Sequence, residues 1–366
     1  MERSWEVPAD DIGPAKILLL HDADAGLEAV VVVDSTAAGV TIGGVRMAED
    51  VSVSEVARLA RAMTLKNAAA GLPHGGGKAG IAASPEAPGK ERLLRAFARA
   101  IRDLGEYVPG PDMGTDETCM AWIHDEIGRA VGLPEVLGGI PLDVVGATGF
   151  GLAVCAEAVE ASGYLRLRGA RVAVQGFGAV GRHAARYLGE RGAVLVGACD
   201  RRGAVVAPAG LDVAGLIAFT AAGRSVGEFP GGTPLPRDEL LVSDCDILVP
   251  AARPDVLTAD NAEQIAARVV LQGANIPATP DGEQVLHKRG ILSVPDFIAN
   301  AGGVICASVE YRGGTRSQAF ALIEEKIRAN TEAVLAATRS RGVSPRQAAI
   351  DLARERVQAA MSYRRF

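Results

Sequence analysis

The feature that most constrains the fold is a glycine-spaced segment between an apolar run and an alanine-rich stretch. The apolar run is Arg171–Gln175, and six residues follow it directly: Gly176, Phe177, Gly178, Ala179, Val180 and Gly181. This pattern predicts a strand, a tight turn and a helix, and a second predicted strand at 193–198 leads to Asp200. Nineteen positions separate Gly181 from Asp200, close to the spacing of an acid that binds a ribose hydroxyl. The segment therefore predicts a Rossmann-type dinucleotide-binding unit.

Each glycine of this segment has a distinct expected role. Gly176 permits the tight turn, Gly178 lets a pyrophosphate approach the backbone, and Gly181 allows close packing of helix on strand. The pyrophosphate then lies at a helix N-terminus. Asp200 favours NAD, because a carboxylate accepts from the 2′-hydroxyl and repels a 2′-phosphate. Arg201 follows at once and can accommodate that phosphate, so NADP stays open.

Three further predicted strands, at 246–249, 269–272 and 291–294, continue the parallel pattern. Ligands of such sheets bind beyond the carboxyl ends of the strands. Ala251, Asn275 and Asn300 follow strands in this way and are expected to contact the cofactor. Either asparagine fits a simple turn equally well.

The N-terminal part contains the candidate catalytic side chains. Lys78 lies in a glycine-rich stretch, 71–80, which we expect to be a loop because glycine weakens helices and strands. A lysine held there away from water would have a lowered pKa and could act as an acid or base. Lys66 precedes it on a predicted helix that begins at a Ser52–Glu55 capping box. Asp112 lies in the proline- and glycine-rich segment 107–116, predicted to be an ordered loop.

Length and composition narrow the class of protein. At 366 residues the chain exceeds a usual single core, so two domains are expected. The net charge of −6 argues against nucleic acid or an anionic membrane as partner. No apolar run is long enough to span a membrane, and Met1–Glu6 lacks a signal-peptide core. Five scattered cysteines and five histidines without ligand spacing predict no metal site and a reducing, cytoplasmic setting.

The motifs of the whole chain, taken in order, resemble those of the glutamate/leucine/phenylalanine/valine dehydrogenase superfamily. They are Gly43-Gly44-Val45-Arg46-Met47, Met63-Thr64-Leu65-Lys66, Gly75-Gly76-Gly77-Lys78-Ala79-Gly80, Pro111-Asp112-Met113-Gly114-Thr115, Gly176 to Gly181, Gln272-Gly273-Ala274-Asn275 and Asn300-Ala301-Gly302-Gly303-Val304.

The resemblance implies a reaction and a role for each motif. The reaction is reversible oxidative deamination of an L-amino acid to a 2-oxo acid and ammonia, with hydride passing between the substrate Cα and nicotinamide C4. Lys66 would bind the α-carboxylate. Lys78 would polarise the keto group when charged and activate water against the iminium when neutral, and Asp112 would shuttle protons. Thr148 and Asn275 would place the nicotinamide and its ribose. His74 has no counterpart role in the family and is expected at most to support the loop of Lys78.

Two departures from the family pattern bear on the substrate. Glutamate-specific members carry a lysine directly before Gly-Gly-x-Arg, where this chain has Ile42. They carry a serine seven residues after the asparagine of Asn-Ala-Gly-Gly, where this chain has Ala307, with Ser308 one step further. A side-chain carboxylate buried there would lack partners, so the sequence favours an apolar branched or aromatic side chain. The remaining expected substrate contacts are Gly44, Gly110, Asn300 and Val304, and the small Gly110 and Ala307 suggest a roomy pocket.

Three alternatives stay open. In the first alternative, the substrate is glutamate and its side-chain carboxylate is bound by a cation placed elsewhere. In favour of it, the cofactor-region stretches 200–212 and 245–275 resemble glutamate-type members more closely. A catalytically silent nucleotide sensor would have lost Lys78 or Asp112, and both are present. A 2-hydroxy acid dehydrogenase would need a His–Asp or Arg pair, and none is evident.

The expected architecture is α/β with two domains and a cleft between them. Residues 1–145 with the C-terminal helices 335–366 are expected to bind substrate and to form the oligomer. Residues 146–334 are expected to form the NAD(P)-binding Rossmann domain. The resemblance implies a homo-oligomer, as a dimer, hexamer or octamer.

Overall fold

The protein consists of two compact units in a computed structural model that describes residues 7–364. Unit 1 comprises Met1–Leu142, Val304–Ala319 and Ile350–Phe366, and unit 2 comprises Asp143–Gly303 and Phe320–Ala349. The chain therefore passes between the units several times. The expected α/β fold with a Rossmann-type half is confirmed, whereas the functional labels given to 1–145, 146–334 and 335–366 stay predictions. Met1–Glu6 lies outside the described residues.

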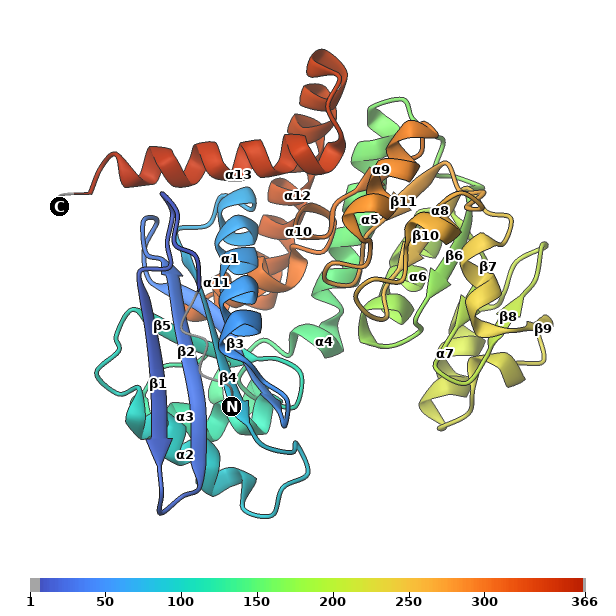
Figure 1. Cartoon of the computed structure of the whole chain (residues 1–366). Coiled ribbons are helices and arrows are strands. Elements are labelled where there is room, and N and C mark those ends of the chain that lie inside the picture. The colour runs from blue at the N-terminus through green and yellow to red at the C-terminus, as the bar shows by residue number, and fades with distance from the viewer. Residues whose placement is uncertain (1–6, 365–366) are drawn as a thin grey trace. The chain divides into compact units, whose positions relative to one another are not determined.

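Unit 1 is built on a five-stranded mixed sheet of order β1-β2-β4-β3-β5 (Figure 1). The strands are β1 Lys16–Asp22, β2 Leu27–Ser35, β3 Thr41–Ala48, β4 Gly75–Ala82 and β5 Tyr107–Pro111. β1 to β2 and β2 to β4 pair antiparallel, and β3 pairs parallel with both β4 and β5. The carboxyl ends of β3 and β5 therefore lie side by side.

Helices cover both faces of this sheet because its strands alternate their apolar side chains. Val30 and Val32 pack with Val56 and Ala60 of α1 (Val53–Ala69). Val31 and Val33, one step along the same strand, join the core that α2 (Lys90–Ala100) and α3 (Glu117–Ile127) cover. Ser52 caps α1 as predicted, but the Glu55 side chain pairs with Arg46. The second half of the predicted capping box is thus replaced by an ion pair.

The expected glycine-rich loop is instead strand β4 from Gly75 onward, and the neighbouring strand β3 likewise contains two glycines, Gly43 and Gly44. The sequence-based reasoning was wrong because it weighed only the backbone entropy of glycine. A Cβ on Gly43 would lie 1.6 Å from the Gly77 carbonyl oxygen, and one on Gly76 would lie 2.1 Å from the Thr64 backbone nitrogen. These strands and α1 approach so closely that only glycine fits, and the packing outweighs the intrinsic cost.

The segment that contains Pro109 and Pro111 is also a strand, β5, and not a loop. β5 pairs only with β3 and lies at the edge of the sheet. Proline is tolerated in such a position because an edge strand leaves one side of its backbone without ladder hydrogen bonds. Asp112 follows directly after the carboxyl end of β5.

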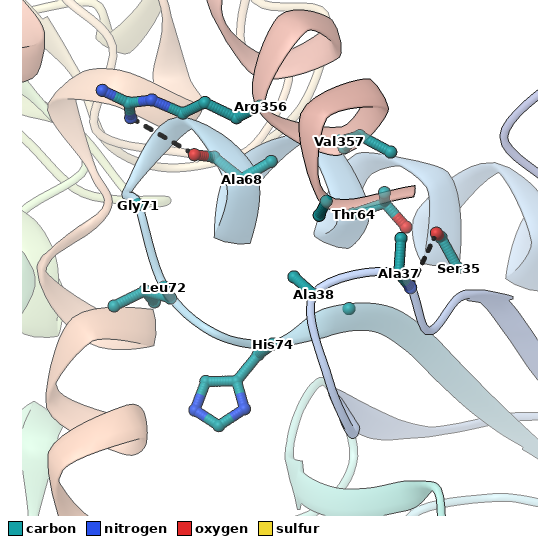
Figure 2. A pocket seen from close by; sticks show the side chains of 12 residues that line it. Ser35, Ala37, Ala38, Thr64, Ala68, Gly71, Leu72, His74, Arg356 and Val357 are labelled. Atoms are coloured by element: carbon teal, nitrogen blue, oxygen red, sulfur yellow. Dashed lines mark hydrogen bonds between the residues drawn. The ribbon is translucent and has the colours of Figure 1, made fainter. Parts of the chain in front are cut away.

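The last helix of the chain closes unit 1. α13 (Pro345–Met361) reaches α1, where Arg356 donates to the carbonyl oxygens of Ala68 and Ala69 at 3.3 and 2.6 Å. A cavity of about 220 Å³ lies between these helices and the turn before β3 (Figure 2). Its wall includes Thr64, Leu72 and Val357.

Unit 2 is built on a seven-stranded sheet of order β12-β11-β10-β6-β7-β8-β9. Its strands are β6 Arg171–Gln175, β7 Val194–Cys199, β8 Ala204–Val206, β9 Thr233–Leu235, β10 Ile247–Pro250, β11 Val269–Leu271 and β12 Leu292–Val294. The strands from β12 to β7 are parallel, and β8 and β9 form an antiparallel edge. All five strands predicted here are confirmed to within two residues. The strand order reverses between β6 and β10, the position where doubly wound sheets bind ligands.

The connections of both units are mainly helical. The remaining α-helices are α4 Leu142–Val145, α5 Ala147–Ala161, α6 Ala179–Glu190, α7 Val213–Ala221, α8 Ala259–Ala262, α9 Pro280–Lys288, α10 Asp296–Ala299, α11 Gly302–Tyr311 and α12 Arg316–Arg341. Short 3-10 turns are Glu135–Leu137, Val226–Glu228 and Arg237–Val242. Ile323, Ile327 and Val334 form a buried stripe on α12. Within residues 7–364, no helix is long and apolar enough to cross a membrane.

Candidate active site

Lys78 and Asp112, which are 34 positions apart in the sequence, form an ion pair in unit 1. The Lys78 Nζ lies 2.9 Å from the Asp112 Oδ1, and the side chains are 6% and 16% exposed. Lys78 comes from β4 and Asp112 from the end of β5, with β3 between them. Strand β3, which lies between them, must leave room for the two side chains to meet, and it does so with a glycine, Gly44. A Cβ there would lie 2.7 Å from the Asp112 Cβ and 3.2 Å from the Lys78 Nζ.

Arg46 binds the other oxygen of the same carboxylate. Its Nε donates to the Asp112 Oδ2 at 2.9 Å, and its Nη1 donates to the Glu55 Oε1 at 2.5 Å. The Asp112 backbone N–H donates to the Thr115 hydroxyl at 3.0 Å, and this hydroxyl donates to the Val45 carbonyl oxygen. The carboxylate is therefore fixed by contacts to both of its oxygens and to its backbone.

The environment shifts the pKa of both members of the pair. Burial lowers the pKa of the Lys78 ammonium, and the attraction of Asp112 does not fully restore it. Burial opposes ionisation of Asp112, but the charges of Lys78 and Arg46 outweigh it and hold the pKa of that carboxyl below its usual value. A lysine with a lowered pKa beside an ionised carboxylate is suited to proton transfer near neutral pH.

The other predicted substrate contacts of unit 1 lie on α1, on α11 and in one apolar cluster. Lys66 is half-buried in the last turn of α1. Ile42 and Ala307 belong to one buried apolar cluster with Val108 and Val131, from β5 and the segment after α3. Val304 is half-buried at the start of α11.

Gly110 does not leave empty space, contrary to our expectation of a roomy pocket. A Cβ built on Gly110 would lie 3.1 Å from the Val131 Cγ2, so the Val131 side chain occupies that space. The sequence gave no reason to single out Val131, because it comes 21 positions after Gly110 in an irregular segment.

Ser308 is directed to His74 and not to the apolar cluster. The His74 Nε2 and the Ser308 Oγ are 2.9 Å apart, and both residues are buried. The His74 ring also meets the edge of Tyr311, with ring centroids 5.7 Å apart. Burial, together with the charge of Arg312, lowers the pKa of His74 to about 4. The imidazole is therefore neutral at pH 7 and supports the start of β4.

The dinucleotide segment of unit 2 has the local geometry that its glycines predict. Gly176 has a φ of 96°, in the region that favours glycine. A Cβ on Gly178 would have no protein atom within 4 Å, so the space above the N-terminus of α6 is open to a ligand. A Cβ on Gly181 would lie 2.0 Å from the Gly176 carbonyl oxygen, which explains the third glycine. These residues fit a pyrophosphate, with Phe177 in the turn and with Ala179 and Val180 in the first turn of α6.

The Asp200 carboxylate is held by donors from its own turn and from the segment at Ser225 and Val226. Its Oδ1 accepts from the Ser225 hydroxyl and from the backbone N–H groups of Arg202 and Gly203, and its Oδ2 accepts from the Val226 N–H. Burial opposes ionisation, but these donors hold the pKa of Asp200 below its usual value. The carboxylate is thus ionised and oriented. Arg201 beside it is exposed.

The loops after β10, β11 and β12 meet at the reversal of strand order. Gly273 and Ala274 donate to the Pro250 carbonyl oxygen, next to Ala251. The Asn300 amide donates to the Asn275 Oδ1 at 3.1 Å. The Asn300 Oδ1 is buried and has no hydrogen-bond partner among residues 7–364, so a ligand donor could satisfy it. Thr148 is half-buried in the first turn of α5, where a hinge was expected, and Gly146 caps that helix.

Among the described residues there is no group of three His, Cys, Asp or Glu side chains that could hold a metal ion. Sequence reasoning missed Arg46, Val131 and the buried Glu310, whose carboxylate accepts from the N–H groups of Leu133 and Ile140 at 3.0 Å each. For Arg46 a signal existed, since it is a charged residue inside a predicted motif.

Comparisons with known proteins show the family of this chain. The profile of the Glutamate/Leucine/Phenylalanine/Valine dehydrogenase family matches residues 138–365, and that of its dimerisation domain matches residues 14–129. The glutamate dehydrogenase of Aeropyrum pernix is 37% identical over 90% of this chain and 85% of its own length. The NADP-specific glutamate dehydrogenase of Saccharolobus shibatae is 38% identical over 76% and 69%.

Two solved structures are also similar. The leucine-bound hetero-hexameric glutamate dehydrogenase of Thermus thermophilus has a TM-score of 0.86 at 32% identity, covering 96% of this chain and 90% of that one. The L-tryptophan dehydrogenase of Nostoc punctiforme has a TM-score of 0.75 at 27% identity, covering 95% and 97%. The fold and the paired lysine and aspartate define an oxidoreductase of the amino acid dehydrogenase class. The chain belongs to the Glu/Leu/Phe/Val dehydrogenase family.

Proposed function

We propose that the protein catalyses the reversible, NAD-dependent oxidative deamination of an L-amino acid with an apolar side chain. The products are the 2-oxo acid and ammonia. The observation that carries the proposal is the buried Lys78–Asp112 ion pair in the same unit as the apolar cluster around Ile42 and Ala307.

The chain's own residues divide the chemistry between them. Lys66 binds the substrate α-carboxylate. Lys78, whose pKa is lowered, exchanges a proton with the oxygen bonded to the reacting carbon or with the water that attacks this carbon. Asp112 exchanges protons with the substrate amine, and also with Lys78, whose Nζ lies 2.9 Å from its Oδ1. The bound nicotinamide supplies a hydride acceptor, which no protein side chain can provide.

The substrate class follows from the cost of burying charge. Ile42, Val108, Val131 and Ala307 offer no polar group to a side-chain carboxylate, and the nearby Ser308 hydroxyl is engaged by His74. An unpaired buried carboxylate costs several kcal/mol, enough to reject glutamate by a large factor. An aliphatic or aromatic side chain gains from the same surface.

A second candidate is glutamate dehydrogenase, because the relatives from Aeropyrum pernix and Saccharolobus shibatae carry that name. Glutamate would need a cation to pair with its side-chain carboxylate, and this cation would have to come from outside the apolar cluster. The residues of that cluster favour the first candidate.

The test is a set of steady-state assays with leucine, valine, phenylalanine, tryptophan and glutamate, each with NAD and with NADP. We expect the highest kcat/KM with an apolar substrate and NAD. A preference for glutamate would refute the substrate class while leaving the chemistry intact. The double variant Ile42→Lys with Ala307→Ser should shift the preference towards glutamate.

The cofactor, assembly and location follow from separate observations. The ionised Asp200, held by Ser225 and Val226, favours NAD because it repels a 2′-phosphate. We expect a homo-oligomer; the similar glutamate dehydrogenase of Thermus thermophilus is a hetero-hexamer, which supports assembly of several chains and leaves the homo-oligomer a proposal of its own. Five free, buried cysteines fit the reducing cytoplasm.

A further inference from the structure

We infer that Arg46 is a positioning residue that confines proton exchange to one oxygen of Asp112. The inference rests on the proposed function of the Lys78–Asp112 pair. Its basis is that the two oxygens of the Asp112 carboxylate have different cations: Oδ1 faces the Lys78 Nζ and Oδ2 faces the Arg46 Nε, each at 2.9 Å.

The two cations differ in what they can do with a proton. A guanidinium keeps its charge throughout the accessible pH range, whereas a buried ammonium can lose its proton. The Asp112 Oδ2 therefore always has a charged donor against it, which disfavours a proton on that oxygen. The proton that Lys78 gives goes to Oδ1, which lies directly against the Lys78 Nζ.

Arg46 is itself held in place from the other side. Glu55, in the first turn of α1, accepts from its Nη1 at 2.5 Å and is 30% exposed. The ion pairs thus join Glu55 from α1, Arg46 from β3, Asp112 after β5 and Lys78 from β4 in one chain of alternating charge. The buried phenol of Tyr107 on β5 also faces this chain, and burial and the charge of Asp112 raise its pKa.

This arrangement predicts pH effects of opposite sign for two substitutions. Removing the charge of Arg46 makes the surroundings more negative, so both Asp112 and Lys78 keep a proton to higher pH. Removing the charge of Glu55 makes them more positive, so both lose the proton at lower pH. The Glu55 effect is the smaller of the two, because no hydrogen bond joins Glu55 directly to Asp112 or Lys78 among the bonds described.

The experiment compares Arg46→Gln, Arg46→Lys and Glu55→Gln by the pH dependence of kcat with the best apolar substrate. We use kcat because kcat/KM also reports the amine of the free substrate. Arg46→Gln should lower kcat by about 100-fold, the size of effect of a misplaced catalytic group, and move both limbs of the profile to higher pH. Arg46→Lys should keep the limbs near their original positions, and Glu55→Gln should move them to lower pH.

Arg61→Gln is the matched control. Arg61 also bridges two acids of unit 1, donating to Asp34 at 2.9 Å and to Asp10 at 2.7 Å, but contacts neither Lys78 nor Asp112. It should lower stability without moving the limbs. NADH binding, measured by fluorescence, and thermal unfolding show which variants are folded. If Arg46→Gln is not folded, Glu55→Gln carries the test, and limbs that stay in place or move to higher pH in that variant would then overturn the inference.

Two results would overturn the inference. One is an Arg46→Gln variant whose kcat is lower while both limbs of its pH profile stay at the wild-type pH values. The other is a shift of equal sign in Arg46→Gln and Glu55→Gln. A failure of the proposed function looks different: the wild type would then lack amino acid dehydrogenase activity, or Asp112→Asn would retain it.

Discussion

At the scale of single residues, the site depends on a lysine whose charge is costly where it stands. Lys78 is 95% buried, and Asp112 is its partner. Breaking such a pair leaves the remaining charge buried and uncompensated. Both members are therefore needed together, and neither substitutes for the other.

We expect Lys78→Ala to reduce kcat by at least about 100-fold, because it removes the ammonium that lies 2.9 Å from the Asp112 Oδ1. NADH binding should be retained, since the glycine segment lies in unit 2. Steady-state rates and a fluorescence titration measure the two effects. Lys288→Ala, at an exposed lysine of α9, is the control. Substantial activity in Lys78→Ala would contradict the assigned role.

His74 should make the protein sensitive to acid. Its pKa is lowered to about 4 in the folded state from a usual 6.5, so the unfolded state binds more protons between these values. The free energy of unfolding should therefore fall as the pH drops from about 6.5 to 4. Urea unfolding at several pH values measures this, and His74→Gln should show a smaller fall. An unchanged slope in that variant would assign the acid sensitivity to other groups.

At the scale of elements, the central strands of unit 1 pack so closely that several of their positions accommodate only glycine. Gly43, Gly76 and Gly77 each lie where a Cβ would strike the backbone or side chain of a neighbour. The resulting close packing brings β3, β4 and α1 together and thereby sets the positions of Arg46, Lys78 and Glu55. A loop could not hold these groups to within tenths of an ångström.

Gly43→Ala should destabilise unit 1 by more than about 4 kcal/mol, because the new Cβ meets a carbonyl oxygen that cannot move aside. Gly105→Ala is the matched control, since a Cβ there has no neighbour within 4 Å, and we expect a change within about 0.5 kcal/mol. Chemical denaturation measures both. Equal stability of the two variants would show that the strands are not so tightly packed.

Gly178→Ala separates folding from cofactor binding in unit 2. The added Cβ meets no protein atom within 4 Å, so the melting temperature should stay close to that of the wild type. The Kd for NADH should rise, because the methyl group enters the space where a pyrophosphate approaches the backbone. An unchanged Kd would place the cofactor elsewhere.

At the scale of the whole molecule, the chain builds each unit from separate segments. The last helix, α13, begins in unit 2 and ends in unit 1, where Val357 is 4% exposed. Arg356 beside it binds the carbonyl oxygens at the end of α1, the helix that carries Lys66 (Figure 2). The final segment thus completes a unit that the first residues begin.

Val357→Asp should therefore destabilise unit 1 by several kcal/mol, because it buries a charge without a partner. Ala359→Asp, two positions later and exposed, should have little effect. Thermal unfolding followed by limited proteolysis distinguishes them. Equal melting temperatures would mean that the C-terminal helix is not part of the core.

Sequence alone was sufficient for features whose determinants are contiguous. The strand, glycine turn and helix at 171–190, the parallel strands of unit 2 and the N-cap at Ser52 all depend on neighbours within a few residues. The order of motifs indicated the family, which the comparisons confirmed.

Tertiary structure decided what depends on residues far apart in the chain. Only the packed sheet turns the glycine stretch at 75–80 into a strand, and only its register places Arg46 against Asp112, 66 positions away. The same is true of Val131 above Gly110 and of Ser308 against His74, 234 positions apart. Local propensity specifies elements, but close packing between strands and helices chooses the neighbours of each side chain, and those neighbours set the charge and shape of the site.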